Sequence, residues 1–354
     1  MSRFFSARHS DLMPYTPGEQ PRDIKYIKLN TNESPFPPSP RALRYAAEAA
    51  VQMQLYPDPE CRVLTEKVAA LCGVDFEEVL LTNGSDEALN FAFMAFCDAE
   101  HPAVFPDITY GFYRVFAQLN NVPYEEIPLT EDYAIRADDY IGLQKTIFIT
   151  NPNAPTGIKL PVSEIERIVA GNPDCVVVVD EAYVDFGAES CIRLIRSYDN
   201  LLVVQTFSKS RSMAGARLGF AVGCRNLIQD LNTIKYSINP YNINRMTMAA
   251  GIGVLEDEAY TRANCERIME NREWTMSELR KLGFAVLESS TNFVFARHPA
   301  LDGAQTYIKL RERGILVRHF NKDRLDMFNR ITIDSRQEME ALIAALRVEV
   351  EAVK

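Results

Sequence analysis

The sequence predicts an α/β protein in which a mostly parallel sheet lies between helices and a smaller α+β domain follows. Three observations support this fold class. The chain has 354 residues, which is too many for one small core. From about residue 62, short apolar runs alternate with amphipathic helical patterns. A second set of strand patterns follows a long helical stretch toward the C-terminal end.

The larger sheet is predicted from apolar runs at 78–82, 102–106, 145–150, 175–180, 200–206 and 217–223. These runs are apolar at nearly every position rather than at alternate ones, which is typical of strands covered on both faces. Helical patterns follow the first three runs, at 86–97, 109–120 and 162–171. This order predicts parallel strands that are joined by helices.

The two ends of the chain differ from this pattern. The N-terminal stretch is rich in proline and polar groups, which predicts an extended arm. Helical patterns begin near residue 245, and the one at 265–283 is typical of a connector between domains. Further strand patterns lie at 284–289, 292–298, 314–320 and 329–334. We therefore expect an arm over 1–40 that joins the small domain, a large α/β domain over 41–260 and a small α+β domain over 261–354.

Composition narrows the class of function. Hydrophobic residues make up 47% of the chain and charged residues 24%, as in ordinary soluble globular proteins. The net charge of −10 argues against a nucleic-acid partner. No apolar run reaches the roughly 20 residues of a membrane span and no signal-peptide pattern is present, so we expect a cytoplasmic location without membrane contact. The seven scattered cysteines include no CxxC pair, which favours reduced thiols over disulfides or a metal site.

Unusual residues follow five of the predicted strands. The segments are TNGSDE (82–87), PDITYGFY (106–113), TNPNAPTG (150–157), DEAYVDF (180–186) and TFSKS (206–210). Ligands of open α/β sheets bind beyond the carboxyl ends of the strands. We therefore expect these five segments to meet at one site.

A candidate anion site lies in the first of these segments. Gly84, Ser85 and Asp86 lead into a predicted helix, whose free N–H groups and dipole attract negative charge. Taken singly, this segment also fits an ordinary helix N-cap, and the basic loop after residue 206 also fits a solvated loop. The hydroxyl and guanidinium groups that would complete an anion site belong to Thr206, Ser208, Arg211 and Arg217.

Lys209 and Asp180 are the second candidate feature. Each follows or ends an apolar strand. A buried ammonium needs a partner or a covalent use, and a buried carboxylate needs a cation or a proton. With an anion site and the aromatic side chains of Tyr110 and Tyr183, which singly also fit packing roles, these are the parts that hold pyridoxal phosphate. The sequence contains no GxGxxG after a strand, no GxxxxGK[ST] and no HExxH, so no other cofactor and no metal is indicated.

The ordered motifs resemble the fold type I pyridoxal-phosphate aminotransferases, and among them the histidinol-phosphate aminotransferase family. The matching segments include KLNTNESPFPPSP (28–40), NGSDE (83–87), NPNAPTG (151–157), VDEAYVDF (179–186), TFSKSRSMAGARLGF (206–220), NPYNIN (239–244) and RITI (330–333). They span nearly the whole chain in the family's order. The resemblance implies a fold type I transferase with a seven-stranded sheet, a homodimer, and transfer of an amino group from histidinol phosphate to 2-oxoglutarate in histidine biosynthesis.

The resemblance also implies roles for individual residues. Lys209 would bind the cofactor aldehyde and move the substrate proton, and Asp180 would pair with the pyridine nitrogen. Tyr183 would contact the ring hydroxyl, and Tyr110 would lie against the ring. The cofactor phosphate would be held by Gly84, Ser85, Asp86, Thr206, Ser208 and Arg217, with Tyr56 reaching it from the neighbouring subunit. The substrate-binding residues would be Tyr15, Asn32, Arg318 and Arg330.

Two positions depart from the family's pattern. The family usually has asparagine immediately before PTG, where this chain has Ala154. We assign the corresponding cofactor contact to Asn153, which would have to take over that role. Pro37 stands where the arm commonly has glycine, which alters the path expected for the arm.

Other functions fit the same motifs. A threonine-phosphate decarboxylase would share the fold, the cofactor and the phosphate-binding arginines. An aromatic-amino-acid aminotransferase would use Tyr15, Phe36 and Tyr113 as an apolar pocket. A non-catalytic binder on this fold would usually carry a separate DNA-binding module, for which we find no room before residue 28.

Overall fold

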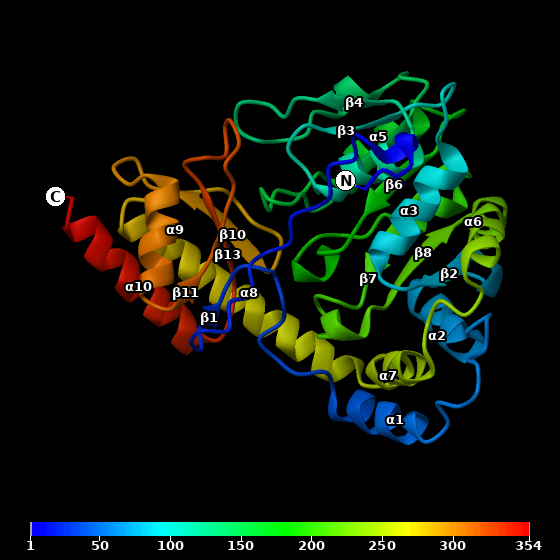
Figure 1. Cartoon of the computed structure of the whole chain (residues 1–354), viewed down its shortest axis with the longest axis horizontal. Helices are drawn as coiled ribbons and strands as arrows, with labels where there is room; N and C mark the ends of the chain where they lie inside the picture. Colours follow the sequence, from blue (N-terminus) through cyan, green and yellow to red (C-terminus); the bar gives the residue numbers. More distant parts are fainter. Residues whose placement is uncertain (1, 354) are drawn as a thin grey trace.

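A seven-stranded sheet forms the centre of the larger part of the molecule. The computed structural model describes residues 2–353 (Figure 1). The strand order is β2-β8-β7-β6-β5-β3-β4, and the pairings are parallel apart from those of β8, which runs antiparallel to β2 and β7. The prediction of a mostly parallel seven-stranded sheet is confirmed. Its strands are Val79–Thr82 (β2), Ala103–Pro106 (β3), Tyr124–Ile127 (β4), Thr146–Thr150 (β5), Val177–Asp180 (β6), Leu201–Thr206 (β7) and Gly219–Gly223 (β8).

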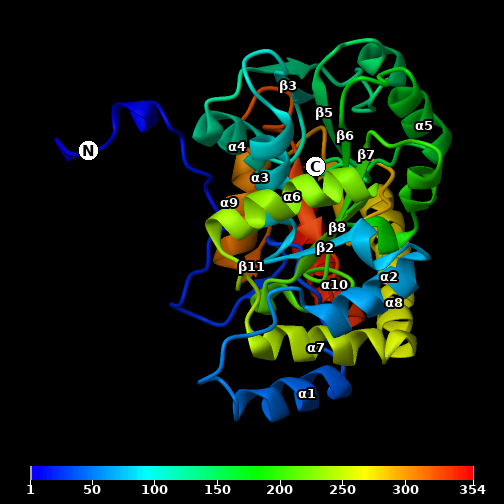
Figure 2. The same cartoon turned by 90° about the vertical axis from the view of Figure 1, so that its right-hand side faces the viewer.

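Helices cover both faces of this sheet. Successive side chains of a strand point to opposite faces, so Ile147 and Ile149 of β5 pack in one layer and Phe148 packs in the other. The first layer contains α2, α5 and α7, and the second contains α3, α4 and α6. The helix α1 lies beside α7, as Figure 2 shows. These helices are Pro40–Ala50 (α1), Arg62–Cys72 (α2), Ser85–Phe96 (α3), Phe112–Asn120 (α4), Val162–Ala170 (α5), Arg225–Ile238 (α6) and Arg245–Leu255 (α7).

The double covering explains the continuous apolar runs. Val177, Val178 and Val179 of β6 are all fully buried, because each face of the strand meets a helix layer. Burying a valine side chain stabilises a fold by about 1.5–3 kcal/mol relative to leaving it exposed. Register then places the ends of neighbouring strands together, since Thr150 of β5 pairs with Asp180 of β6.

A four-stranded antiparallel sheet in the order β12-β13-β10-β9 forms the centre of the smaller part. The long helix α8 runs from the neighbourhood of α7 to this sheet (Figure 1). Apolar side chains of α8, α9 and α10 pack with those of β10 and β13 in one cluster. The elements are Glu258–Lys281 (α8), Ala285–Val286 (β9), Phe293–Arg297 (β10), Gly303–Glu312 (α9), Arg318–His319 (β12), Asn329–Thr332 (β13) and Arg336–Glu351 (α10).

The N-terminal arm reaches the smaller part through a short strand. Ile27–Lys28 (β1) pairs in parallel with Ile315–Leu316 (β11). Leu29 adds a contact between the arm and β13, because its carbonyl accepts a hydrogen bond from Thr332 N at 2.9 Å. The division of the chain at residues 40 and 260 stays a prediction, and α8 runs across the second of these positions.

Two details of the strand prediction were wrong. The segment 314–320 is not one strand, because β11 pairs with β1 while β12 pairs with β13 in a different sheet. The strand β4 was not among the predicted strands, since its sequence Tyr-Glu-Glu-Ile is half polar. It lies at the edge of the sheet, where charged side chains can remain in water.

Candidate active site

A cavity of about 390 Å³ lies where β5, β6 and β7 end. The last residue of each of these strands lines it: Thr150, Asp180 and Thr206. The structure therefore brings the strand ends together as the topology of an open α/β sheet requires. The predicted site residues that line this cavity are Ser85, Asp86, Tyr110, Asp180, Tyr183, Thr206, Ser208, Lys209 and Arg217.

Asp180 is a buried carboxylate without a cationic partner among residues 2–353. It is 3% exposed. Its Oδ1 accepts a hydrogen bond from Ala182 N at 3.1 Å, and its Oδ2 lies 3.4 Å from the donating hydroxyl of Tyr113. Burial raises the pKa of Asp180 to about 7, and the nearby carboxylate of Asp86 adds to this effect. A cationic group in the cavity would restore its charged form.

Lys209 lies in the loop that follows β7 and lines the same cavity as Asp180. Its Nζ lies 3.4 Å from the carbonyl oxygen of Thr31 and 5.8 Å from the centroid of the Tyr183 ring. Burial, together with the positive charge of Arg330, lowers the pKa of Lys209 to about 8. The neutral amine, which a nucleophile or a general base requires, is therefore far more populated near neutral pH than in an ordinary lysine.

The beginning of α3 forms a cradle for an anion. Gly84 precedes the helix with φ 81°, and a Cβ at this position would lie 2.6 Å from Nη2 of Arg217. A Cβ at Gly219 of β8 would lie 2.4 Å from the backbone nitrogen of Ser85. Gly84 favours glycine because of its positive φ, whereas Gly219 requires glycine because a side chain would push β8 away from the backbone at the start of α3. The helix N-terminus supplies N–H groups and a positive dipole end.

Two side chains converge on Asp86 in the first turn of α3. Arg217 Nη2 donates to its Oδ2 at 3.0 Å, and the Tyr110 hydroxyl donates to its Oδ1 at 2.7 Å. Burial and the Asp86 charge raise the pKa of Tyr110 well above its ordinary value, so the phenol stays protonated. The hydroxyls of Thr206 and Ser208 lie nearby in the cavity wall and bond to each other at 3.0 Å.

Asn32 and Arg330 lie behind Tyr183 rather than in the cavity lining. Asn32 Nδ2 donates to the Tyr183 hydroxyl at 2.9 Å. Arg330 Nη2 donates to the carbonyl of Asn30 at 3.1 Å, and its buried Nε has no partner among the described residues. Burial lowers the pKa of Arg330. An anion that reached this guanidinium would satisfy its unpaired donor.

Tyr15 and Arg318 lie at the arm. The Tyr15 ring stacks on Phe112 with the ring centroids 4.3 Å apart, and it lies 6.5 Å from the ring of Tyr110. Arg318 Nη2 donates to the carbonyl of Thr16 at 3.0 Å, so it fixes the arm next to Tyr15. Neither residue lines the cavity of this single chain.

Two further predicted residues point elsewhere. Tyr56 is 77% exposed and stacks on Tyr241 at 4.6 Å, away from the cavity lining. Asn153 is buried. Its Oδ1 accepts a hydrogen bond from Thr109 Oγ1 at 2.9 Å, and its Nδ2 donates one to the carbonyl of Ile108 at 3.0 Å. Ala154 lines the cavity instead. The roles assigned to Tyr56 and Asn153 stay predictions.

Sequence reasoning included Tyr113 and Thr150 in the segments expected at the site but gave neither residue a contact with Asp180. The Tyr113 hydroxyl lies 2.8 Å from Thr150 Oγ1 and also reaches Asp180, so the two residues hold the carboxylate from one side. Both carried a signal. Tyr113 is only three residues after Tyr110, and the two ring centroids lie 5.9 Å apart, while Thr150 ends the strand next to β6. Thr31 and Glu33 of the arm also line the cavity.

Comparison with known proteins identifies the family. A family model described as "Aminotransferase class I and II" matches residues 24–346. The chain belongs to this family. This aminotransferase is 49% identical over 351 residues to the histidinol-phosphate aminotransferase of a Marinomonas species, covering 98% of this chain and 99% of the relative. It is 51% identical over 351 residues to histidinol-phosphate aminotransferase 1 of Bordetella parapertussis, with the same coverage.

Solved structures agree with this assignment at the level of the fold. The histidinol-phosphate aminotransferase from Sinorhizobium meliloti, in complex with pyridoxal-5'-phosphate, has a TM-score of 0.85 at 24% identity and covers 93% of this chain and 92% of that chain. The L-threonine-O-3-phosphate decarboxylase from Porphyromonas gingivalis has a TM-score of 0.81 at 22% identity, with coverages of 92% and 99%. At these identities the likeness shows the fold alone. The aminotransferase therefore has the fold type I architecture that its motifs implied.

The buried carboxylate generates a prediction for the cofactor-free protein. The pKa of Asp180 is about 7 when folded and 3.8 in its ordinary state. Between these values the folded state binds more protons than the unfolded state, so Asp180 lowers the free energy of unfolding as the pH rises. We expect Asp180→Asn to become more stable relative to the wild type from about pH 4 to about pH 7, by on the order of 3 kcal/mol. Urea unfolding at a series of pH values measures this difference, and a difference that does not change with pH would contradict the assignment.

Proposed function

We propose that this aminotransferase is a pyridoxal-phosphate enzyme that converts histidinol phosphate and 2-oxoglutarate to imidazole acetol phosphate and glutamate, a step of histidine biosynthesis. The observation that carries the proposal is the meeting of Lys209 and Asp180 in one cavity beside the α3 cradle. Relatives that are about half identical over nearly the whole chain carry the name of this activity.

The residues present fit the cofactor. Asp180 is a buried acid that lacks a cation, and it would pair with the protonated pyridine nitrogen. Gly219 lets β8 pack directly against the backbone of Ser85, so the start of α3 stays in the cavity wall, where its N–H groups would hold a phosphate. Arg217, Ser85, Thr206 and Ser208 would hold that phosphate, and Tyr110 and Tyr183 would contact the ring and its hydroxyl.

Lys209 performs the proton transfer in this proposal. When bound, pyridoxal phosphate supplies an aldehyde for the amine and a ring that withdraws electrons from the Cα–H bond. The lowered pKa of about 8 favours the neutral amine of Lys209, which would take the proton from Cα of the substrate and later give it up to complete the transfer. Tyr113 and Thr150 keep the Asp180 carboxylate in place while this occurs.

The arginines account for two different substrates. Arg330 offers an unpaired buried Nε, and Arg318 holds the arm at Thr16 and Pro17. A guanidinium binds phosphate and carboxylate with the same planar fork, so one pocket can accept a phosphorylated amine and then 2-oxoglutarate. Tyr15 and Asn32 would complete the pocket from the arm.

The competing activities differ in products rather than in fold. A threonine-phosphate decarboxylase of the same fold would release carbon dioxide and need no oxo-acid acceptor. An aromatic-amino-acid aminotransferase would prefer phenylalanine, although Tyr113, one of the residues expected in an apolar pocket, is bonded to Thr150 and Asp180. A non-catalytic binder would leave Lys209 without a covalent role.

The proposal includes a homodimer. Apolar side chains that are more than half exposed cluster next to Tyr56, namely Val51, Met53 and Leu55. Such a patch is typical of an interface. In a symmetric dimer the same surface on both chains is buried, and Tyr56 can then reach the phosphate cradle of the other subunit.

The location and the partners of this enzyme are part of the proposal. Within residues 2–353, none of the helices has the length and apolar character of a membrane span. No cluster of metal-ligating side chains is found in the same residues. We propose a cytoplasmic enzyme that acts on small molecules and does not bind nucleic acid or membrane, in keeping with its net charge of −10.

Replacement of Lys209 tests the covalent role. We expect Lys209→Ala to lose the visible absorbance of the protein-bound cofactor and to lower kcat by at least about 1000-fold, because the amine is both the attachment point and the base. Lys209→Arg, which keeps the charge, is expected to behave in the same way. Lys159→Ala at an exposed site serves as the control and should retain both properties. Retention of absorbance and turnover by Lys209→Ala contradicts the proposal.

The substrate is tested by half-reactions. Histidinol phosphate added alone should convert the cofactor spectrum to that of the amine form, and 2-oxoglutarate should then restore it. We expect kcat/KM for histidinol phosphate to exceed that for phenylalanine by at least about 100-fold, because the side chain of phenylalanine carries no anionic group for the arginines to bind. Phosphothreonine should give no carbon dioxide. Release of carbon dioxide without an acceptor would assign the decarboxylase instead.

Mixing two inactive variants tests the contribution of Tyr56 across the interface. Tyr56→Ala and Lys209→Ala each disable their own homodimer in a different way. In a mixed dimer one site has an intact Lys209 and receives an intact Tyr56 from the other chain, so remixing equal amounts should restore about a quarter of the wild-type activity. Two variants that both carry Lys209→Ala form the control. If Tyr56 acted within its own chain, the mixture would stay as inactive as its components.

A further inference from the structure

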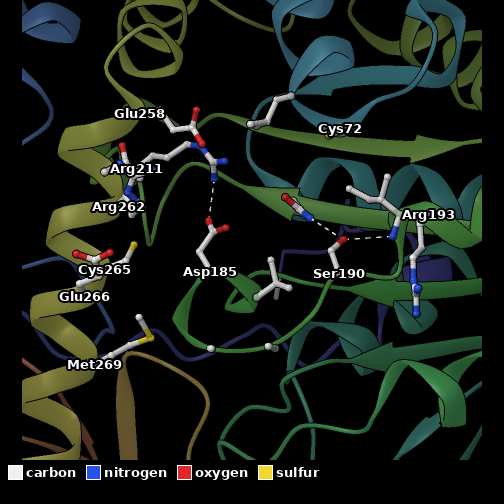
Figure 3. A pocket seen from close by; sticks show the side chains of 17 residues that line it. Cys72, Asp185, Ser190, Arg193, Arg211, Glu258, Arg262, Cys265, Glu266 and Met269 are labelled. Atoms are coloured by element: carbon white, nitrogen blue, oxygen red, sulfur yellow. Dashed lines mark hydrogen bonds and ion pairs between the residues drawn. The ribbon is translucent and has the colours of Figure 1, made fainter.

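A second cavity, of about 640 Å³, is lined by Arg211, which stands two positions after Lys209 in the chain (Figure 3). Its wall includes Asp185, Ser190, Gln205 and Arg211, and α8 forms the opposite wall. Among residues 2–353, none lines both this cavity and the one that contains Lys209. The segment that contains Lys209 and Arg211 therefore has a front side, which faces the cofactor site, and a rear side, which faces this second cavity.

The rear side of this segment is held by one carboxylate. Asp185 accepts a hydrogen bond from Ser210 Oγ and another from Arg211 Nη1 at 2.9 Å, and the dashed line in Figure 3 marks the second. The Arg211 side chain is only 9% exposed, and its guanidinium carbon lies 5.1 Å from the centroid of the Phe207 ring. Both residues that follow Lys209 are thus bound to Asp185.

Such contacts matter because little else fixes the lysine side chain. Its Nζ makes one long contact, 3.4 Å from the Thr31 carbonyl. The chain then turns sharply, with Ser212 at φ 57°. Asp185 lies two residues after Tyr183, in the turn Val184–Phe186, so it links the segment of the ring-contacting tyrosine to that of the lysine. A half-buried ion pair is a weak source of stability, because desolvation offsets much of the attraction, so a positioning role is the better account.

We propose that Asp185 is a positioning residue for Lys209, which fixes the direction of its amine through Ser210 and Arg211. The inference rests on the proposed function, in which Lys209 binds the cofactor and moves the substrate proton. Asp185 touches neither substrate nor cofactor in this account, since it lines only the rear cavity. It also balances the charge of Arg211, which stands two positions from the reacting amine.

Asp185→Asn tests the proposal because it keeps the shape of the side chain and removes its charge. We expect kcat to fall roughly tenfold while KM for the amine donor stays within about twofold, since misplacement affects the reacting geometry more than binding. The unbalanced guanidinium of Arg211 should also lower the pKa of the Lys209 amine. That pKa is measured in the cofactor-free, full-length protein from the pH dependence of competitive acetylation of Lys209 by acetic anhydride, followed by mass spectrometry.

Two further variants make the test specific. Ser210→Ala removes one of the two bonds, and its effect on kcat should be smaller than that of Asp185→Asn and not additive with it. Glu189→Gln is the matched control. It removes a carboxylate from the same loop and leaves an arginine unpaired, but its pair with Arg193 is 3.3 Å long and both side chains are 65% exposed. This control should change neither kcat nor the pKa of Lys209.

The outcomes separate the two proposals. Unchanged kcat and unchanged Lys209 pKa in Asp185→Asn would overturn the positioning role, as would a loss of kcat that merely follows the folded fraction. Asp185→Asn could lower the pKa of Lys209 while the wild-type protein takes up no pyridoxal phosphate. That result would support the contact of Asp185 with the lysine loop and refute the proposed function.

Discussion

The unpaired carboxylate of Asp180 constrains the rest of the site. It ends a strand whose residues are buried on both faces, so neither helix layer leaves it a path to water. Burial raises its pKa to about 7, and among the described residues no cation offsets this cost. The cavity is the remaining direction in which a positive group can approach. The packing that stabilises β6 therefore also creates the demand for a cationic group at this point.

The sheet topology brings the other groups to the same place. β6 pairs with β5 and β7 in parallel, so the three strand ends lie side by side. The reversal of β8 has a separate consequence, because the strand begins at the edge where β2 and β7 end, beside the beginning of α3. Gly219 then packs against Ser85, and Arg217 reaches Asp86. One antiparallel strand in a parallel sheet thus completes the anion cradle.

Burial and strand pairing also decide which strands could be predicted from the sequence. Strands such as β6 are buried on both faces, so a continuous apolar run identified them directly. β4 has one open edge and tolerates Glu125 and Glu126, which removes the apolar signal. The run at 314–320 is apolar enough for one strand, but buried Val317 separates two pairings with distant segments. Pairing partners of this kind are set by tertiary contacts and leave no local pattern.

For the site, motif and topology predicted the residues that face the cavity but not those that hold them. Asp180 and Lys209 stand at strand ends, and position alone placed them together. The next residue in the chain, Glu181 or Ser210, is held in each case by residues that do not line the cavity. Glu181 accepts hydrogen bonds from Ser190 Oγ at 2.6 Å and from Gln205 Nε2 at 2.8 Å, and Ser210 is bonded to Asp185. Gln205 belongs to β7, whereas Asp185 and Ser190 come from the loop after Tyr183, whose polar residues look like any surface turn in the sequence. A strand-end motif therefore identifies the reacting groups, whereas the contacts that orient them become visible only once the chain behind the motif has folded against it.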